Sequence, residues 1–182
     1  MSSFRSDLKA AEITEEDVAG MLVHSVINAV CHEKVLDEVR SLYDYSVTVG
    51  RRANAVQYLF EIKDDLKSGE TGNFAVEKAR WNKDGDYEKT GINVTTADYW
   101  AIKIWKTGVE GVYLIPTAVL RHFIMFEDNR LVEGGDDKRT HMYLFDVVLL
   151  VEHGLRLDLA AKDSIVLRKF SRIAPPDKRH YK

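Results

Sequence analysis

The sequence has one cysteine, no long apolar run and no excess of positive charge, and each shortage excludes a class of protein. With Cys31 alone, the chain can form no internal disulfide and no cysteine-based zinc site. No apolar stretch approaches the roughly 20 residues that span a bilayer, and Asp146 interrupts the longest candidate, 143–151. The first residues lack the apolar segment of a secretory signal. We therefore expect a protein of a reducing, cytoplasmic compartment with no membrane partner.

The overall charge is close to neutral but unevenly distributed. The 182 residues are 45% hydrophobic and 30% charged, which is typical of a globular protein and excludes a disordered tail, a collagen-like fibre and a coiled-coil rod. A net charge of −3 differs from the basic excess of proteins that coat nucleic acid. Residues 168–182 nevertheless carry six basic side chains and one acidic side chain. Such a tail can contact phosphate, although a solvated chain end is its more common role.

Hydrophobic periodicity predicts alternating helices and strands along the chain. An acidic N-cap segment begins at Thr14, and apolar residues then recur at helical spacing as far as Val30. The expected helices are 14–30, 33–42, 95–98, 116–126 and the second part of 142–151. The expected strands are 43–49, 56–63, 73–79, 99–105, 112–115, the first part of 142–151, and 164–167. The polar segments 81–90 and 133–137 are expected to be loops.

This order of elements is typical of an α/β domain with one central mixed β-sheet flanked by helices. We expect residues 1–126 to form the core domain. Residues 127–182 are expected to be a C-terminal extension packed on the same domain, and its last part is the basic tail 168–182.

The most informative feature is a set of charged side chains on neighbouring predicted strands. Side chains alternate between the faces of a strand. If the first two strands form a hairpin with Val49 opposite Val56, Asp44 lies opposite Glu61. Directly opposed residues have Cβ atoms about 4.5–5.5 Å apart, and two like charges at that distance are destabilising unless they are compensated. A divalent cation is an obvious compensator, because Mg²⁺ is commonly held by one or two carboxylates together with substrate phosphates.

Two further residues extend this cluster. Lys63 lies two residues after Glu61 on the same face, where its ammonium can stabilise phosphate charge or position water. On the third predicted strand, Asn73, Ala75 and Glu77 share a face, so Glu77 can act as a further ligand or base. Alternatively, Glu61 and Lys63 form only the solvent face of a hairpin. The convergence of Asp44, Glu61 and Glu77 favours a site.

The chain resembles the PD-(D/E)XK phosphodiesterase superfamily, the restriction-endonuclease-like nucleases. That family carries an acid on one strand and an acid-x-Lys triplet on the next, within an αβββαβ core. The resemblance is closer to small phage-encoded members and extends from Asp44 to about Trp105. It rests on Tyr43-Asp44-Tyr45, Phe60-Glu61-Ile62-Lys63-Asp64-Asp65, Thr71-Gly72-Asn73-Phe74-Ala75-Val76-Glu77, Thr90-Gly91-Ile92 and Thr95-Thr96-Ala97-Asp98-Tyr99-Trp100. The proline that gives the family its name is absent, because Tyr43 precedes the acid.

The resemblance implies hydrolysis of DNA phosphodiesters with Mg²⁺ or Mn²⁺, in phage or prophage DNA processing such as junction, flap or duplex cleavage. Asp44 and Glu61 would be metal ligands, Lys63 would orient water or neutralise charge, and Glu77 would be an accessory acid and ligand. Some members add a glutamate from the first helix, for which Glu33 is our candidate and Glu16 an alternative. Asn73 is a possible accessory residue, and members that cut both strands often act as homodimers.

Other interpretations are weaker. Asn82, Asp84 and Asp86 alternate as in a calcium loop, but the positions that such a loop reserves for Gly and Glu hold Tyr87 and Asn93. The main functional alternative is a catalytically silent nuclease fold that acts as a DNA- or protein-binding module, which the acidic overall charge favours. Fold alone does not decide between the two functions.

Overall fold

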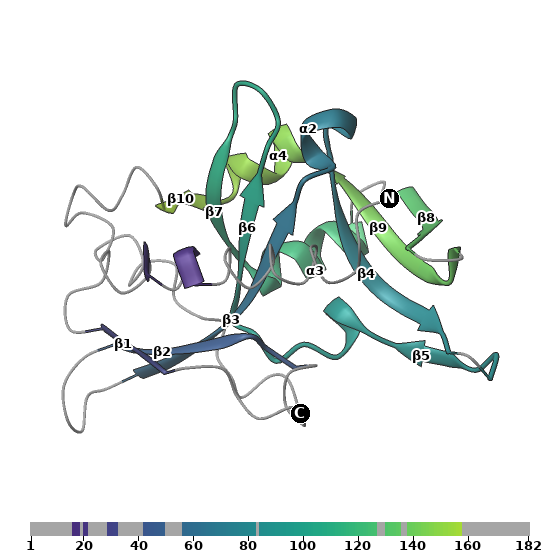
Figure 1. Ribbon diagram of the computed structural model, residues 1–182, viewed down its shortest axis with the longest axis horizontal. Helices are drawn as coiled ribbons and strands as arrows, with labels where there is room; N and C mark the ends of the chain where they lie inside the picture. Colours follow the sequence, from purple (N-terminus) through teal and green to yellow (C-terminus); the bar gives the residue numbers. More distant parts are fainter. Residues whose placement is uncertain are drawn as a thin grey trace.

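The computed structural model describes residues 16–18, 20–21, 29–32, 42–49, 56–82, 84–126, 130–135 and 138–157. They form a mixed α/β fold with two β-sheets and a few helices (Figure 1). Within these ranges, no helix is both long and apolar enough to cross a membrane. Residues 33–41 of the predicted helix 33–42, the strand 164–167, the candidate Glu33 and the basic tail 168–182 lie outside the described residues.

The first sheet has six strands in the order β1-β2-β3-β6-β7-β10. Strand β3 runs parallel to β6, and the other neighbouring pairs are antiparallel, so the expected mixed sheet is confirmed. The bounds are β1 Ala29–His32, β2 Tyr45–Val49, β3 Val56–Asp65, β6 Tyr99–Ile104, β7 Gly111–Pro116 and β10 Leu155–Arg156.

The second sheet has four strands in the order β5-β4-β9-β8, all antiparallel. Its bounds are β4 Asn73–Trp81, β5 Tyr87–Lys89, β8 Arg130–Gly134 and β9 Thr140–Asp146. The third predicted strand thus lies here as β4, outside the mixed sheet. The expected loop 81–90 is wrong in part, because β4 continues to Trp81 and turns back into β5. The expected loop 133–137 also begins too early, since β8 extends through Gly134.

In the described part of the chain, helical elements that connect the strands are α2 Ser68–Thr71, the 3₁₀ helix η2 Gly91–Asn93, α3 Thr117–Phe126 and α4 Val147–Glu152. The expected helix before residue 126 and the strand-then-helix pattern of 142–151 are confirmed. Asp146 begins α4 as an N-cap, because its carboxylate accepts hydrogen bonds from the N–H groups of Val148 and Leu149.

Two helical expectations are wrong. Residues 16–18 and 20–21 are helical, but the segment that ends at His32 is β1, which pairs with β2. Pairing with a neighbouring strand outweighs the helical spacing of its apolar residues. Residues 95–98 form no helix because their side chains bind distant backbone instead. Thr95 Oγ1 donates to the Leu42 carbonyl (2.9 Å), and Asp98 Oδ2 accepts from the N–H of Leu59 (2.9 Å).

Strand alternation divides the apolar residues between the two faces of the first sheet. On one face, Phe60 and Ile62 of β3 pack with Tyr99 of β6 and with Val18 of the N-terminal helical segment. On the other face, Trp100 and other β6 residues pack against the second sheet, α3 and α4. Glu61 and Lys63 alternate with Phe60 and Ile62, so they lie on the face that is turned toward the second sheet.

A hydrogen-bonded corner joins the two sheets. Asp65 ends β3, and its carboxylate accepts from the N–H of Ser68 and from the N–H of Ala75 in β4, each at 3.2 Å. The fully buried Ser68 donates its hydroxyl to the Asp65 carbonyl (2.6 Å) and accepts from the N–H of Trp105 at the end of β6 (3.0 Å). In Figure 1, β3 and β4 approach each other below α2 and diverge toward the lower side of the view. The corner therefore sets the relative placement of the two sheets.

Asp65→Ala is expected to destabilise the protein by about 1–3 kcal/mol, because the N–H groups of Ser68 and Ala75 lose their acceptor in a partly buried corner. Chemical denaturation measures this difference. Glu70→Ala, which removes an exposed carboxylate from the same corner, is the matched control and should change stability by less than about 0.5 kcal/mol. Equal losses in the two variants would contradict this role of Asp65.

Candidate active site

The paired carboxylates lie where the sequence predicts them. Strand β2 pairs with β3 in the expected register, with Val49 opposite Val56. The Asp44 N–H donates to the Phe60 carbonyl (2.8 Å) just beyond the last ladder pair, which brings Asp44 beside Glu61. The predicted register is therefore confirmed.

The protein backbone orients the Asp44 carboxylate. Its Oδ2 accepts a hydrogen bond from the N–H of Ile62 in β3 at 2.6 Å. Such charge-assisted hydrogen bonds are short and strong. The Asp44 side chain is thus fixed relative to the strand that carries Glu61 and Lys63.

Glu61 and Lys63 form an ion pair on the inner face of β3. Glu61 is only 8% exposed, and its Oε1 lies 2.6 Å from Lys63 Nζ. The Lys63 side chain remains 44% exposed, so its ammonium is reachable from the solvent side. The pair compensates one of the two neighbouring carboxylates internally.

The electrostatic surroundings keep Lys63 protonated. Partial burial alone would lower the pKa of the Lys63 ammonium, but the charges of Glu61, Asp44 and Glu77, together with the hydrogen bond to Glu61, raise it above 10.5. A lysine with a raised pKa acts as a fixed positive charge near neutral pH. It does not act there as a proton acceptor.

Glu77 enters from the second sheet. A β-bulge in β4 between Glu77 and Ala79 interrupts the ladder next to it. Gly91, with φ +50°, packs directly on this residue, because a Cβ at Gly91 would lie 2.2 Å from the Glu77 carbonyl oxygen. The Thr90-Gly91 segment therefore supports the backbone that presents Glu77.

One cleft collects these side chains. It has a volume of about 650 Å³, and its lining includes all four of the predicted principal residues, Asp44, Glu61, Lys63 and Glu77. The predicted accessory residue Asn73 is not among its lining residues. The Asn73 side chain instead donates to the Thr71 carbonyl (2.9 Å), within the turn that precedes β4.

The cleft also contains residues to which the sequence analysis assigned no chemistry. Arg80, Glu88 and Lys89 of the β4–β5 hairpin line one wall. Trp100 lines the cleft as well and lies beside Glu61 in the parallel β3–β6 register. Trp100 reaches the site through the long-range β3–β6 pairing, whereas Arg80, Glu88 and Lys89 belong to a hairpin in a segment that the sequence predicts to be mostly loop.

Two buried polar atoms in the cleft lining have no hydrogen-bond partner in the described part of the chain. They are Trp100 Nε1 and Thr90 Oγ1. Native proteins seldom leave such groups unpaired. Their presence distinguishes this region from an ordinary packed core.

The donor set suits a hard divalent cation that keeps part of its water shell. Asp44 and Glu61 provide oxygen ligands on neighbouring strands, which is the donor type that Mg²⁺ prefers. Among the described residues, no three His, Cys, Asp or Glu side chains are grouped closely enough to form a complete metal cluster. The residues therefore fit a cation held by two carboxylates and completed by water and phosphate oxygens.

The solved structures to which this chain is similar include two nucleases. No protein-family model matches the chain, and no curated protein matches it. A nuclease from a fusselovirus is 8% identical with a TM-score of 0.42, covering 94% of this chain and 96% of that one. A bacterial homing endonuclease is 16% identical with a TM-score of 0.48, covering 94% of this chain and 98% of that one.

Gly91→Ala is expected to destabilise the protein by about 1–3 kcal/mol more than Gly108→Ala, because only the former introduces a contact with the Glu77 backbone. Gly108 is a matched control, since it also has positive φ (+90°) but nothing within 4 Å of an added Cβ. Thermal or chemical unfolding of the two variants measures the difference. Equal stabilities would show that Gly91 does not support Glu77.

The Lys63 ammonium is expected to titrate above 10.5 in the wild-type protein and at lower pH in Glu61→Gln, because that variant removes its nearest negative charge. The stabilisation from the ion pair is then present at neutral pH, where both groups are charged, and is lost as pH rises through the raised pKa of Lys63. NMR titration of the lysine side chain measures both values. Glu152→Gln, on α4, should leave the Lys63 titration unchanged, and an equal shift in both variants would contradict the assignment.

Proposed function

We propose that this protein is a metal-dependent nuclease that hydrolyses DNA phosphodiester bonds in the cleft between the two sheets. The observation that carries the proposal is the arrangement of Asp44, Glu61 and Glu77 around the Lys63 ammonium in one cleft. Carboxylates from two sheets, gathered around one charged lysine, are expensive for stability. A site that binds a cation and a phosphate explains why they are together.

Each residue has a role that follows from its position. Asp44 and Glu61 would hold Mg²⁺ or Mn²⁺, with Glu77 as an accessory acid. A bound cation of this kind polarises a phosphoryl oxygen and lowers the pKa of bound water. Lys63, as a protonated group that is partly exposed, would neutralise charge that develops on the phosphate. The Ile62 N–H keeps Asp44 oriented before substrate arrives.

A binding module without hydrolytic activity is the second candidate function. The Glu61–Lys63 ion pair favours it, because the pair already neutralises one carboxylate and can persist without a metal. A phage or prophage role, a homodimer, a cytoplasmic location and the form of the DNA substrate stay predictions from the sequence.

Cleavage of labelled DNA tests this function. Wild-type protein is expected to cut at least one member of a panel of linear, branched and single-stranded DNA in Mg²⁺ or Mn²⁺, and to stop in EDTA. Asp44→Asn, Glu61→Ala and Lys63→Ala should each lower the rate by more than about a hundredfold. Glu152→Ala, which removes an exposed carboxylate on α4, is the control and should cut normally.

The outcomes separate the two candidate functions. Cutting that requires metal and all three side chains supports the nuclease. DNA binding without cutting would support the binding module instead. Equal rates in wild type and Lys63→Ala would show that the ammonium has no part in hydrolysis.

A further inference from the structure

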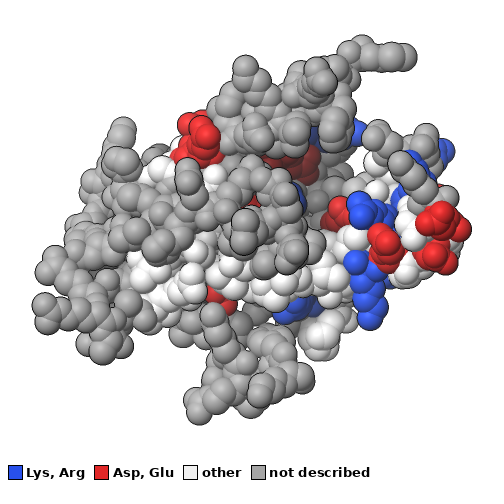
Figure 2. All heavy atoms as spheres, turned by 60° about the horizontal axis from the view of Figure 1, so that its bottom comes forward, with Lys and Arg blue, Asp and Glu red and all other residues white. Residues whose placement is uncertain are grey.

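The wall of the cleft opposite β3 is a hairpin with a defined internal structure. Strands β4 and β5 pair with Arg80 opposite Glu88 and Trp81 opposite Tyr87. Figure 2 looks at the molecule from the lower side of Figure 1 and shows charged side chains of both signs gathered at the right-hand end, the side on which Figure 1 draws β5. Arg80 and Glu88 of this hairpin line the cleft, so the hairpin brings charged groups of both signs to it.

The turn of this hairpin is held by Asn82. Its Oδ1 accepts hydrogen bonds from the N–H groups of Asp84 (2.9 Å) and Asp86 (2.8 Å), and its own N–H donates to the Asp86 carbonyl (2.9 Å). The Asn82 oxygen is thus engaged by backbone donors. This agrees with the rejection of a calcium loop and indicates that the turn orders the hairpin.

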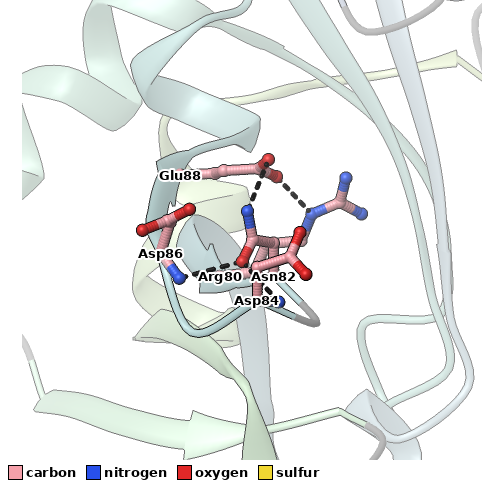
Figure 3. Close-up of polar contacts among 5 residues, drawn as sticks. All are labelled: Arg80, Asn82, Asp84, Asp86 and Glu88. Atoms are coloured by element: carbon pink, nitrogen blue, oxygen red, sulfur yellow. Dashed lines mark hydrogen bonds and ion pairs between the residues drawn. The ribbon is translucent and has the colours of Figure 1, made fainter.

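Glu88 links that ordered turn to Arg80. Its Oε2 lies 3.2 Å from Arg80 Nε, and its Oε1 accepts from Asn82 Nδ2 at 3.4 Å (Figure 3). Both carboxylate oxygens therefore have a partner within the hairpin. Figure 3 shows the two terminal nitrogens of Arg80 turned away from Glu88. The contact engages only Nε and leaves the bidentate edge of the guanidinium for another acceptor.

A gain in folding stability does not explain the contact between Arg80 and Glu88. The two side chains are 58% and 44% exposed, and exposed ion pairs contribute little to folding. The contact instead limits the orientations of Arg80 at the cleft. A guanidinium held in this way loses less conformational entropy when it binds a second anion.

The cleft is lined by charged residues of both signs. Four carboxylates line it, those of Asp44, Glu61, Glu77 and Glu88, against the cations Lys63, Arg80 and Lys89. Lys63 pairs with Glu61 on β3, and Arg80, held through Nε by Glu88, is the guanidinium on the hairpin wall of the cleft. A chain of phosphates that enters this cleft needs cations on that wall, and the planar guanidinium matches phosphate geometry.

We propose that Arg80, oriented by Glu88, binds a backbone phosphate next to the one that is cleaved. This proposal rests on the proposed function, because it assigns the DNA backbone to the same cleft. Arg80 is the binding residue and Glu88 is a positioning residue. The contact is to phosphate and is independent of base sequence.

Fluorescence anisotropy with a labelled DNA duplex in Ca²⁺ tests the proposal separately from cleavage in Mg²⁺. Arg80→Gln is expected to weaken DNA binding by about tenfold. It should also lower the slope of log Kd against log salt concentration by about one. Arg130→Gln, at the opposite edge of the second sheet, removes the same charge from an exposed position and is the matched control. It should change Kd by less than about twofold.

Glu88→Ala distinguishes positioning from simple charge. If Glu88 only repels DNA, Glu88→Ala should tighten DNA binding by the same factor in the wild-type background and in the Arg80→Gln background. If it orients Arg80, the substitution should weaken binding in wild type and tighten it only in the Arg80→Gln background. This opposite sign is the expected result, and a uniform tightening would overturn the positioning role.

Cleavage and binding can fail independently. Loss of binding in Arg80→Gln without any cutting by wild type would support the phosphate contact and reject the nuclease. Normal binding and salt dependence in Arg80→Gln, while wild type cuts DNA, would overturn the phosphate contact and leave the nuclease in place. If the wild-type protein neither binds nor cuts DNA, both the phosphate contact and the nuclease function are rejected.

Discussion

The corner at Asp65 and Ser68 is the contact on which the arrangement of this protein depends. One carboxylate at the end of β3 accepts backbone N–H groups from α2 and from β4, and one buried hydroxyl joins that corner to the end of β6. Because β3 and β4 belong to different sheets, these bonds place the two sheets relative to each other. Glu61 lies on one sheet and Glu77 on the other, so the cleft between them is a consequence of this corner.

Three negatively charged side chains line the same cleft, and a different interaction restrains each of them. A backbone N–H orients Asp44, the Lys63 ammonium pairs with Glu61, and the close approach of Gly91 supports the backbone of Glu77. None of these interactions turns a carboxylate away from the cleft. On the opposite wall the charges are reversed, because there the carboxylate of Glu88 restrains the cation Arg80. Both walls thus present oriented charge to one space, which suits an extended anion and its counter-cation.

Much of the wall of the cleft formed by β2 and β3 could be predicted, because side chains alternate regularly along a strand. The alternation of β2 and β3 indicates the faces of Asp44 and Glu61, and the register assumed for the hairpin, with Val49 opposite Val56, is the one that forms. Helices were less predictable. The segment ending at His32 carries apolar residues at helical spacing, but it pairs with β2 as a strand. The segment 95–98 forms no helix because Thr95 and Asp98 bind the distant backbone of Leu42 and Leu59.

The sequence by itself determined which acidic and basic residues share a strand face, because side-chain direction in a strand depends only on local alternation. Asp44, Glu61 and Lys63 belong to that part of the answer. The tertiary structure alone decided that the third strand leaves the mixed sheet, and that Trp100, Arg80 and Glu88 reach the same cleft. Those placements depend on pairing between segments far apart in the chain and on the hydrogen bonds of a buried corner. Neither produces a periodic signal in the sequence around the residues concerned.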